Sequence, residues 1–361
     1  MRIHFRNNIY RGIIFCLFII LNTNHLNAQS ASITGFVIDA SNDKPIEYAS
    51  VYISGTTKGT STKEDGSFVL FGITKGINKI VVSMIGYEAQ IFTIEDASDF
   101  RKGEKIKLQP KVYDFSQIDI EAKEAGDWKI LYKTFEKQFL GSGDFAGSCI
   151  IENKYILNLN EKEGVLYAAC REPLKIYNKA LGYKINCILH SFSYDYKSQT
   201  VTYVIDPQFI ECVPSSSDSI SLINRNRVLA YTGSTQHLLR SLLMNGKKFE
   251  DEGFELSYLL SENKLAYIES SDEIVFYDNE TKLNILSPQT GSLSKINRSS
   301  SGLNITFRGK SKNGSSQIFI KARRGISFSS EGRLLYPEEF MLTGVLSESR
   351  MSDLLPSDWE Q

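Results

Sequence analysis

Histidine is the first residue type to weigh for chemistry, because imidazole acts as a metal ligand and as a general base near neutral pH. After the N-terminal segment the chain has two, His190 and His237. A zinc carboxypeptidase holds its metal partly through a His-x-x-Glu pair, but the third residue after His190 is Ser193 and the third after His237 is Arg240. We therefore predict no metal site and expect each histidine to be a packed or surface residue and not a ligand.

Other catalytic motifs are also missing from the sequence. There is no Gly-x-Ser-x-Gly nucleophile turn and no Gly-x-Gly-x-x-Gly dinucleotide turn. Gly309-Lys310-Ser311 ends like a phosphate-binding loop, but Asn304 stands where that loop needs its first glycine. We predict that the chain is not an enzyme, that it uses no cofactor, and that it has no catalytic residue of a familiar kind.

One polar cluster could bind a ligand. His237 and Arg240 lie three residues apart on a predicted helix that Ser234 caps, so their side chains share one face, and Tyr231 lies just upstream. One interpretation is a site for an acidic group formed by Tyr231, His237 and Arg240. The other, which we favour, is a set of contacts that ties the helix to a neighbouring sheet.

Four cysteines follow the N-terminal segment, and no two have the spacing of a zinc or thiol-redox motif. In an oxidising compartment they could form up to two disulfides. The alternative is four buried, reduced cysteines that act as small apolar residues. The sequence leaves both interpretations open for Cys149, Cys170, Cys187 and Cys212.

The N-terminus has the order of a secretory signal peptide. Three arginines precede an apolar run from Ile13 to Leu21, and this run is too short to cross a bilayer as a helix. Ala28 is a suitable residue before the cleavage point. We expect residues 1–28 to be removed, and the mature protein to be exported, periplasmic or outer-membrane-associated, with no transmembrane helix.

Charge excludes one class of partner. The chain has 41 Lys+Arg against 42 Asp+Glu, so it lacks the positive excess that binding to nucleic acid requires. The basic stretch from Lys310 to Arg324 is interleaved with strand-like residues and is interpreted as a solvated strand face. We predict no nucleic-acid partner.

The elements that position these residues are mostly strands. Between Ser32 and Ala122, short strand-like runs alternate with turns such as Asp65-Gly66, Lys75-Gly76 and Gly86, a pattern typical of a β-sandwich. The predicted strands are Ile33–Asp39, Glu47–Ile53, Thr57–Thr62, Ser67–Phe71, Ile77–Met84, Glu88–Ile94, Lys105–Leu108 and Gln117–Glu121.

Several segments of this region, in order, resemble the carboxypeptidase regulatory-like domain. The resemblance covers residues 30–122 and implies a transthyretin-like, seven-stranded immunoglobulin-like sandwich of the kind found after the signal peptide of envelope proteins; it implies a fold and not an activity. The segments are Ile33-Thr34-Gly35-Phe36-Val37-Ile38-Asp39, Pro45-Ile46-Glu47-Tyr48-Ala49-Ser50-Val51, Gly55-Thr56, Gly59-Thr60, Asp65-Gly66-Ser67-Phe68 and Ile85-Gly86-Tyr87.

A polar linker at residues 123–126 precedes a second, larger β-rich domain at residues 127–361. Aromatic and apolar residues at helical spacing predict a helix near 128–140, and further helices are expected near 235–245 and 348–355, the last one capped by Ser347. The polar run Ser215–Ser219 is expected to be a loop. The fold class is therefore mainly β, with a few packed helices.

Segments of this second region resemble uncharacterised envelope proteins in which such a body follows the regulatory-like sandwich. That resemblance brings no catalytic residues. We predict a non-catalytic interaction or scaffold protein whose partner is an envelope protein or glycan; the alternative is an enzyme of unrecognised type that acts on an envelope polymer or glycan through the C-terminal domain. The segments are Leu174–Ile185, Ala230–Leu242 and Arg350–Pro356.

Overall fold

The computed structural model describes most of the chain between residues 31 and 360. The ranges are 31–74, 76–111, 126–212, 214–242, 249–259, 265–268, 275–278, 283–286, 302–308, 313–320, 326–329, 331–334 and 340–360. The predicted signal peptide, the strand Gln117–Glu121, most of the linker and the basic residues Lys310, Lys312, Lys321, Arg323 and Arg324 lie outside them. Within these ranges, no helix is both long and apolar enough to span a membrane.

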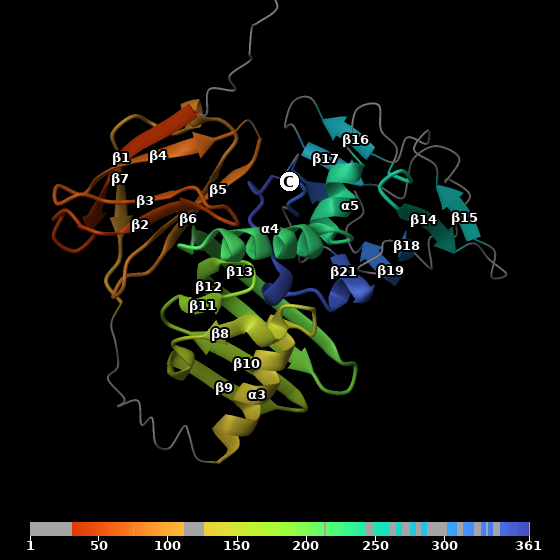
Figure 1. Cartoon of the computed structure of the whole chain (residues 1–361). Coiled ribbons are helices and arrows are strands. Elements are labelled where there is room, and N and C mark those ends of the chain that lie inside the picture. The colour runs from red at the N-terminus through yellow and green to blue at the C-terminus, as the bar shows by residue number, and fades with distance from the viewer. Residues whose placement is uncertain are drawn as a thin grey trace, which may run out of the picture.

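The N-terminal part is a sandwich of two β-sheets, drawn in red and orange in Figure 1. One sheet has the order β4-β1-β7, in which β7 runs parallel to β1, and the other has the order β3-β2-β5-β6. Its seven strands are β1 (Ala31–Asp39), β2 (Ser50–Ile53), β3 (Gly59–Ser61), β4 (Ser67–Ile73), β5 (Asn78–Ser83), β6 (Gln90–Ile94) and β7 (Glu104–Leu108).

Alternation along these strands builds the sandwich core. In β4, Phe68 and Leu70 are buried while Val69 and Phe71 are exposed, which is the period of two that a strand imposes. The buried side chains of both sheets meet in one apolar cluster, which includes Ile33, Val37, Val51, Ile80, Val82 and Leu108. This arrangement confirms the mainly-β fold class and the N-terminal sandwich.

The body is a six-stranded sheet with a helix on one face. Its strands are β8 (Cys149–Ile151), β9 (Leu157–Lys162), β10 (Val165–Cys170), β11 (Leu174–Asn178), β12 (Tyr183–Asp195) and β13 (Thr200–Glu211). Strand β12 pairs along one edge with β11 and β10 and along the other with β13. Helix α3 (Asp127–Leu140) stands where the aromatic spacing predicts a helix, and its buried Phe135 and Phe139 contact Phe192 of β12.

Two helices join the body to the C-terminal part. Helix α4 (Ser217–Tyr231) occupies a segment whose first residues were expected to form a loop; that prediction was wrong because Ser216 caps the helix, accepting a hydrogen bond from the Ser219 N–H at 3.2 Å. Helix α5 (Thr235–Ser241) begins at the predicted Ser234 cap. Figure 1 shows α4 crossing the middle of the molecule.

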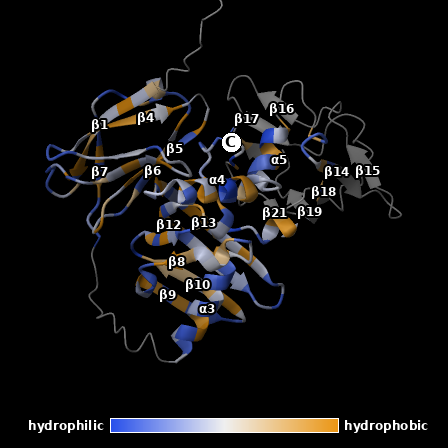
Figure 2. Ribbon diagram, viewed as in Figure 1, coloured by the Kyte–Doolittle hydropathy of each residue, from blue (hydrophilic) through white to orange (hydrophobic). Residues whose placement is uncertain are grey.

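The rest of the chain adds two further small sheets. One has the order β15-β14-β18-β19-β21, with β14 (Phe254–Leu259), β15 (Leu265–Ile268), β18 (Gly302–Arg308), β19 (Asn313–Ile320) and β21 (Phe340–Gly344). The other joins β16 (Val275–Asp278), β17 (Leu283–Leu286) and β20 (Ile326–Phe328). In Figure 2, hydrophobic and hydrophilic residues alternate along the strands of the sandwich and the body.

The helix expected near 348–355 is absent, and two short 3-10 turns, Val345–Ser347 and Met351–Asp353, stand there instead. Backbone carbonyls that would be paired within a helix accept hydrogen bonds from other elements instead. The Ser142 N–H donates to the Glu348 carbonyl at 3.2 Å, and the Asn178 amide donates to the Ser352 carbonyl at 2.7 Å. Tertiary contacts therefore override the local helical pattern.

Gly143 and Gly147, between α3 and β8, allow a direct test of how the C-terminal segment, residues 345–360, packs. A Cβ at Gly143 would lie 1.6 Å from Oδ2 of the buried Asp353, whereas a Cβ at Gly147 would meet nothing within 4 Å. We expect Gly143→Ala to lower the free energy of unfolding by about 1–3 kcal/mol, because Asp353 must move. Gly147→Ala is the matched control and should leave it near the wild-type value. Urea denaturation measures both; equal midpoints would contradict the packing.

Candidate functional site

The junction between the sandwich and the body centres on one buried carboxylate. Asp206 lies on β13 and its side chain is 1% exposed. It accepts hydrogen bonds from Ser54 Oγ at 2.6 Å and Lys79 Nζ at 2.7 Å, both from the sandwich, and its other oxygen lies 2.7 Å from His190 Nε2 of the body. Residues from both parts of the chain therefore meet at a single side chain.

A β-bulge brings His190 to this carboxylate. In the pairing of β12 with β13, Leu189 lies opposite Ile205 and Ser191 opposite Val204, which leaves His190 as the extra residue. Bulges of this kind redirect a side chain and are frequent near functional sites. Here the bulge turns the His190 ring toward Asp206, while 34% of that side chain remains exposed to solvent.

The ionised form of Asp206 is stabilised by its hydrogen-bond partners. Burial by itself raises the pKa of a carboxyl group, but the hydrogen bonds from His190, Lys79 and Ser54 outweigh it, so the pKa of Asp206 lies below its ordinary value. The carboxylate is therefore ionised at neutral pH and paired with Lys79 across the junction. A buried ion pair of this kind holds two surfaces in one relative position, because an unpaired charge there is costly.

These side chains do not form a hydrolytic triad. In such a triad the histidine stands between the nucleophile and the carboxylate, so that it can take the nucleophile's proton. Here the carboxylate of Asp206 stands between Ser54 and His190, each on a different oxygen. Ser54 donates a hydrogen bond directly to the Asp206 carboxylate, with no histidine between them. The arrangement serves to tether the two parts.

Backbone hydrogen bonds extend the junction along β13. The Gly55 N–H donates to the Pro207 carbonyl at 2.7 Å, and the Phe209 N–H donates to the Thr56 carbonyl at 3.0 Å. Gln208 also accepts from Ser50 Oγ at 3.1 Å. The loop that follows β2 therefore lies against one half of β13, much as an additional strand would.

The C-terminal segment also forms hydrogen bonds with the loop that follows β2. The Ser357 N–H donates to the Gly55 carbonyl at 2.7 Å. The carboxylate of Asp358 accepts from the Thr57 N–H at 2.9 Å and from Thr57 Oγ1 at 2.6 Å, and lies 3.6 Å from Lys58 Nζ. The last residues of the chain therefore hold the loop in place against the body.

Arg333 is a further cation at the junction. Its guanidinium donates to the Ser54 and Ile77 carbonyls of the sandwich, the latter at 2.9 Å. Burial lowers the pKa of Arg333. The loop that follows β2 is thus contacted from β13, from the C-terminal segment and from Arg333 after β20.

The structure brings the predicted cluster of Tyr231, His237 and Arg240 together. The Tyr231 and His237 rings lie 4.7 Å apart, and the Arg240 guanidinium lies 5.4 Å from the Tyr231 ring centre. Arg240 donates to three backbone carbonyls, of Glu331 at 3.0 Å and of Ser357 and Trp359 at 2.9 Å. These bonds tie the helix to the C-terminal segment, and a ligand role for the cluster stays a prediction.

His237 itself is buried among aromatic rings. Its Nδ1 accepts from the Gly233 N–H at 3.1 Å, its Nε2 lies 3.4 Å from Glu252, and the Phe254 ring is 4.9 Å away. Burial lowers the pKa of His237 despite the nearby Glu252 carboxylate. The neutral imidazole is therefore the form that the folded protein favours.

All four cysteines are free thiols in the structure. Burial raises the pKa of Cys149 to about 12 and that of Cys170 to about 11, and it also raises the pKa of the fully buried Cys187. Thiols held in this protonated form are poor nucleophiles. Pairing between them stays a prediction. In the described parts of the chain, no group of three or more His, Cys, Asp or Glu residues could hold a metal ion.

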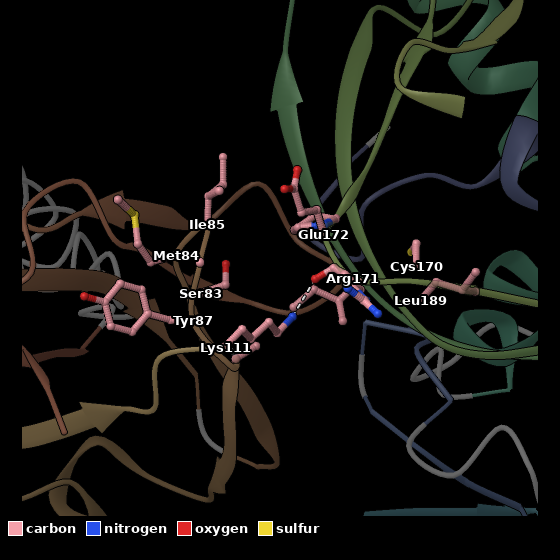
Figure 3. A pocket seen from close by; sticks show the side chains of 13 residues that line it. Ser83, Met84, Ile85, Tyr87, Lys111, Cys170, Arg171, Glu172 and Leu189 are labelled. Carbon is pink, nitrogen blue, oxygen red and sulfur yellow. Dashed lines mark hydrogen bonds between the residues drawn. The ribbon is translucent and has the colours of Figure 1, made fainter. Parts of the chain in front are cut away.

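A small crevice also lies between the sandwich and the body. Figure 3 shows Met84, Ile85 and Tyr87 on the sandwich side, with Arg171 and Glu172 across from them. A hydrogen bond from the Lys111 ammonium to the Arg171 carbonyl spans the gap. The crevice encloses about 60 Å³, which has room for a few water molecules. It is too small for us to assign it a ligand.

The junction residues Ser54, Lys79, His190 and Asp206 were not predicted as a group. Ser54 and Asp206 are 152 residues apart, and neither position stands out by type or spacing. The sequence offered two hints. One is a histidine inside a strand. The other is Pro207, directly after Asp206, because a proline within a strand indicates an edge strand. Neither hint identifies the partner residues.

Replacing Asp206 should loosen the junction. Asp206→Ala leaves Lys79 and Ser54 without their buried acceptor, so we expect the free energy of unfolding to fall by about 2–4 kcal/mol. Amide hydrogen exchange at Gly55 and Phe209 should accelerate as well. The control is Glu88→Ala, which removes an exposed carboxylate of the sandwich. Unchanged exchange at both amides in Asp206→Ala would contradict this account of the junction.

His237 should make stability depend on pH. The pKa of His237 is lowered in the folded state, so below about pH 6.5 the unfolded chain binds the proton more readily and stability falls as the pH falls. An asparagine at this position keeps an acceptor near the Gly233 N–H and does not titrate. We expect the His237→Asn free energy of unfolding to fall less than the wild-type value between pH 7 and 5 in urea denaturation. Parallel pH profiles would contradict this assignment.

Comparison with known proteins places the N-terminal sandwich in a family. Residues 33–119 match the model of the CarboxypepD_reg-like domain, a range that includes all seven sandwich strands except the start of β1. No curated protein matches the sequence. Among solved structures, the chain is similar to a "putative carbohydrate binding protein" from Bacteroides uniformis, with 10% identity, coverage of 50% of this chain and 79% of that chain, and a TM-score of 0.17.

Proposed function

We propose that this protein, whose N-terminal sandwich is a CarboxypepD_reg-like domain, is a non-catalytic binding or scaffold protein of the bacterial envelope. It presents the sandwich and the body in one fixed relative position to an envelope protein or glycan. The observation that carries the proposal is the bonding of Asp206, whose buried carboxylate has partners from both parts at once.

The polar groups at the junction favour a structural role over a chemical one. Asp206 has three close side-chain partners, and Arg240 donates to three backbone carbonyls. A catalytic acid, base or nucleophile must instead face the position where a substrate would bind. Groups that are held by the protein's own backbone are suited to fixing geometry.

Export is part of the proposal. The arginines before the apolar run and the small Ala28 support a signal peptide. A sandwich directly after such a segment would lie outside the cytoplasm, in the periplasm or at the outer membrane. There it could dock on other envelope components.

The alternative is an enzyme that acts on an envelope polymer or glycan through the C-terminal domain. Its support is the proximity of His237 to Glu252 and Tyr231, since a histidine near a carboxylate can act in proton transfer. However, His237 is 6% exposed, and its Nδ1 already accepts from the Gly233 N–H. A binding role therefore has the stronger support.

Crosslinking and affinity capture from intact cells test the proposal. The full-length protein, Asp206→Ala and the control Glu88→Ala are each expressed with the same tag. We expect the wild type and Glu88→Ala to recover the same partner set, and Asp206→Ala to lose the members that contact both the sandwich and the body.

Two other outcomes would count against the proposal. Recovery of nothing above the untagged control by any of the three proteins contradicts a binding role. If Asp206→Ala retained the complete set, the partner would bind one part alone, and the requirement for a fixed junction would be wrong.

A further inference from the structure

Strand β13 is an edge strand, and the outer edges of its two halves have different surroundings. Its only pairing among the described strands is with β12. From Pro207 to Phe209 its outer edge is covered by the sandwich loop at Gly55 and Thr56. From Thr200 to Ile205 the residues are partly buried except for Thr202, which is exposed, and no described strand lies along that edge.

Alternation along the strand sets the direction of its backbone groups. The Pro207 carbonyl and the Phe209 N–H point outward, since both bond to the sandwich loop. In an antiparallel ladder every second residue points the same way, so the N–H and C=O groups of Val201, Tyr203 and Ile205 also point outward. Three donors and three acceptors therefore follow one another along the open half of the edge.

The sequence of this open half lacks the usual protection of a sheet edge. Proteins block such edges with charged residues, proline or very short strands. At the other end of the same sheet, β9 carries Glu161 and Lys162, and β8 has three residues. By contrast, Thr200–Ile205 reads Thr-Val-Thr-Tyr-Val-Ile, with no charge and no proline. All six are residues that favour strands.

We propose that the outer edge of β13, from Val201 to Ile205, binds an extended peptide segment of a partner protein by strand addition. This inference rests on the proposed binding function and names its site. The added strand pairs with the backbone of Val201, Tyr203 and Ile205 and carries uncharged, β-branched side chains that suit Thr202 and Val204. It continues along the edge from the sandwich loop, which already pairs with the same strand at Pro207 and Phe209.

A peptide fits this edge better than a second copy of the chain does. Two β13 strands paired antiparallel about Tyr203 would place Pro207 of one copy opposite residue 199 of the other. The hairpin tip before Thr200 would then lie where Gly55 and Thr56 are bonded to Pro207 and Phe209. The sandwich loop therefore obstructs symmetric pairing, while a short segment avoids it.

The probe is a fluorescein-labelled peptide, Thr-Val-Thr-Val-Thr-Val, with a version methylated at alternate backbone nitrogens as its control. We expect the unmodified peptide to bind the full-length protein in fluorescence anisotropy and to slow amide hydrogen exchange at Val201, Tyr203 and Ile205. Methylation should weaken binding by about tenfold or more, because it removes strand hydrogen bonds. Equal binding by both peptides, or unchanged exchange at those amides, would overturn the proposal.

Two variants locate the site on the protein. Thr202→Lys puts a charge on the exposed side of the open edge, and Asn160→Lys puts the same charge at an exposed position of the opposite edge strand, β9. We expect Thr202→Lys to weaken peptide binding about tenfold and Asn160→Lys to leave it unchanged. Equal losses in the two variants would overturn the assignment to β13.

The same variants separate this proposal from the proposed function. If Thr202→Lys recovers the full wild-type partner set in cells, the binding role stands and the β13 site is wrong. If the wild type itself recovers nothing, the binding role fails, whatever the peptide does. Concentration-dependent dimerisation of the wild type that Thr202→Lys abolishes would show that a second copy occupies the edge and would overturn the peptide assignment.

Discussion

The need to pair one buried charge organises this molecule. Asp206 is ionised at the point where the sandwich meets the body, and a carboxylate in that position is stable only with its partners around it. Ser54 and Lys79 come from one sheet of the sandwich, at the end of β2 and on β5, and His190 comes from a bulge in the body. Because the partners come from both sides, the charge restrains the sandwich and the body together.

The C-terminal segment supports that junction along its length. It crosses the end of α3, where Arg350 donates to Gln138, then passes Asn178 of β11 and Arg240 of α5, and ends against the sandwich loop through Asp358. Contacts with so many elements explain why it forms short turns in place of a helix. A segment whose carbonyls accept from neighbours gains more from those bonds than from its own local pattern, because each buried acceptor must be satisfied.

The local sequence pattern was sufficient to predict much of the fold. Alternation in β4 and the aromatic spacing in α3 predict both elements, because each buries one face against a single core. Helix α4 was missed since its serine-rich start shows no regular apolar repeat, and its Ser216 cap is the signal that indicates a helix. Tyr231, His237 and Arg240 come together because they are near in sequence. The Asp206 junction could not be predicted, since no periodicity connects residues 54, 79, 190 and 206.

The same constraint explains how an open strand edge can serve for binding. A free strand that must first become ordered gives up binding energy for that ordering, whereas a strand already held in place does not. The junction holds β13 at Pro207 and Phe209, and within the open half Tyr203 packs on Phe139 of α3 with ring centres 5.8 Å apart. The open half is therefore fixed both at its end and at its middle. Fixing the sandwich against the body thus also prepares the edge of β13 to receive a partner segment.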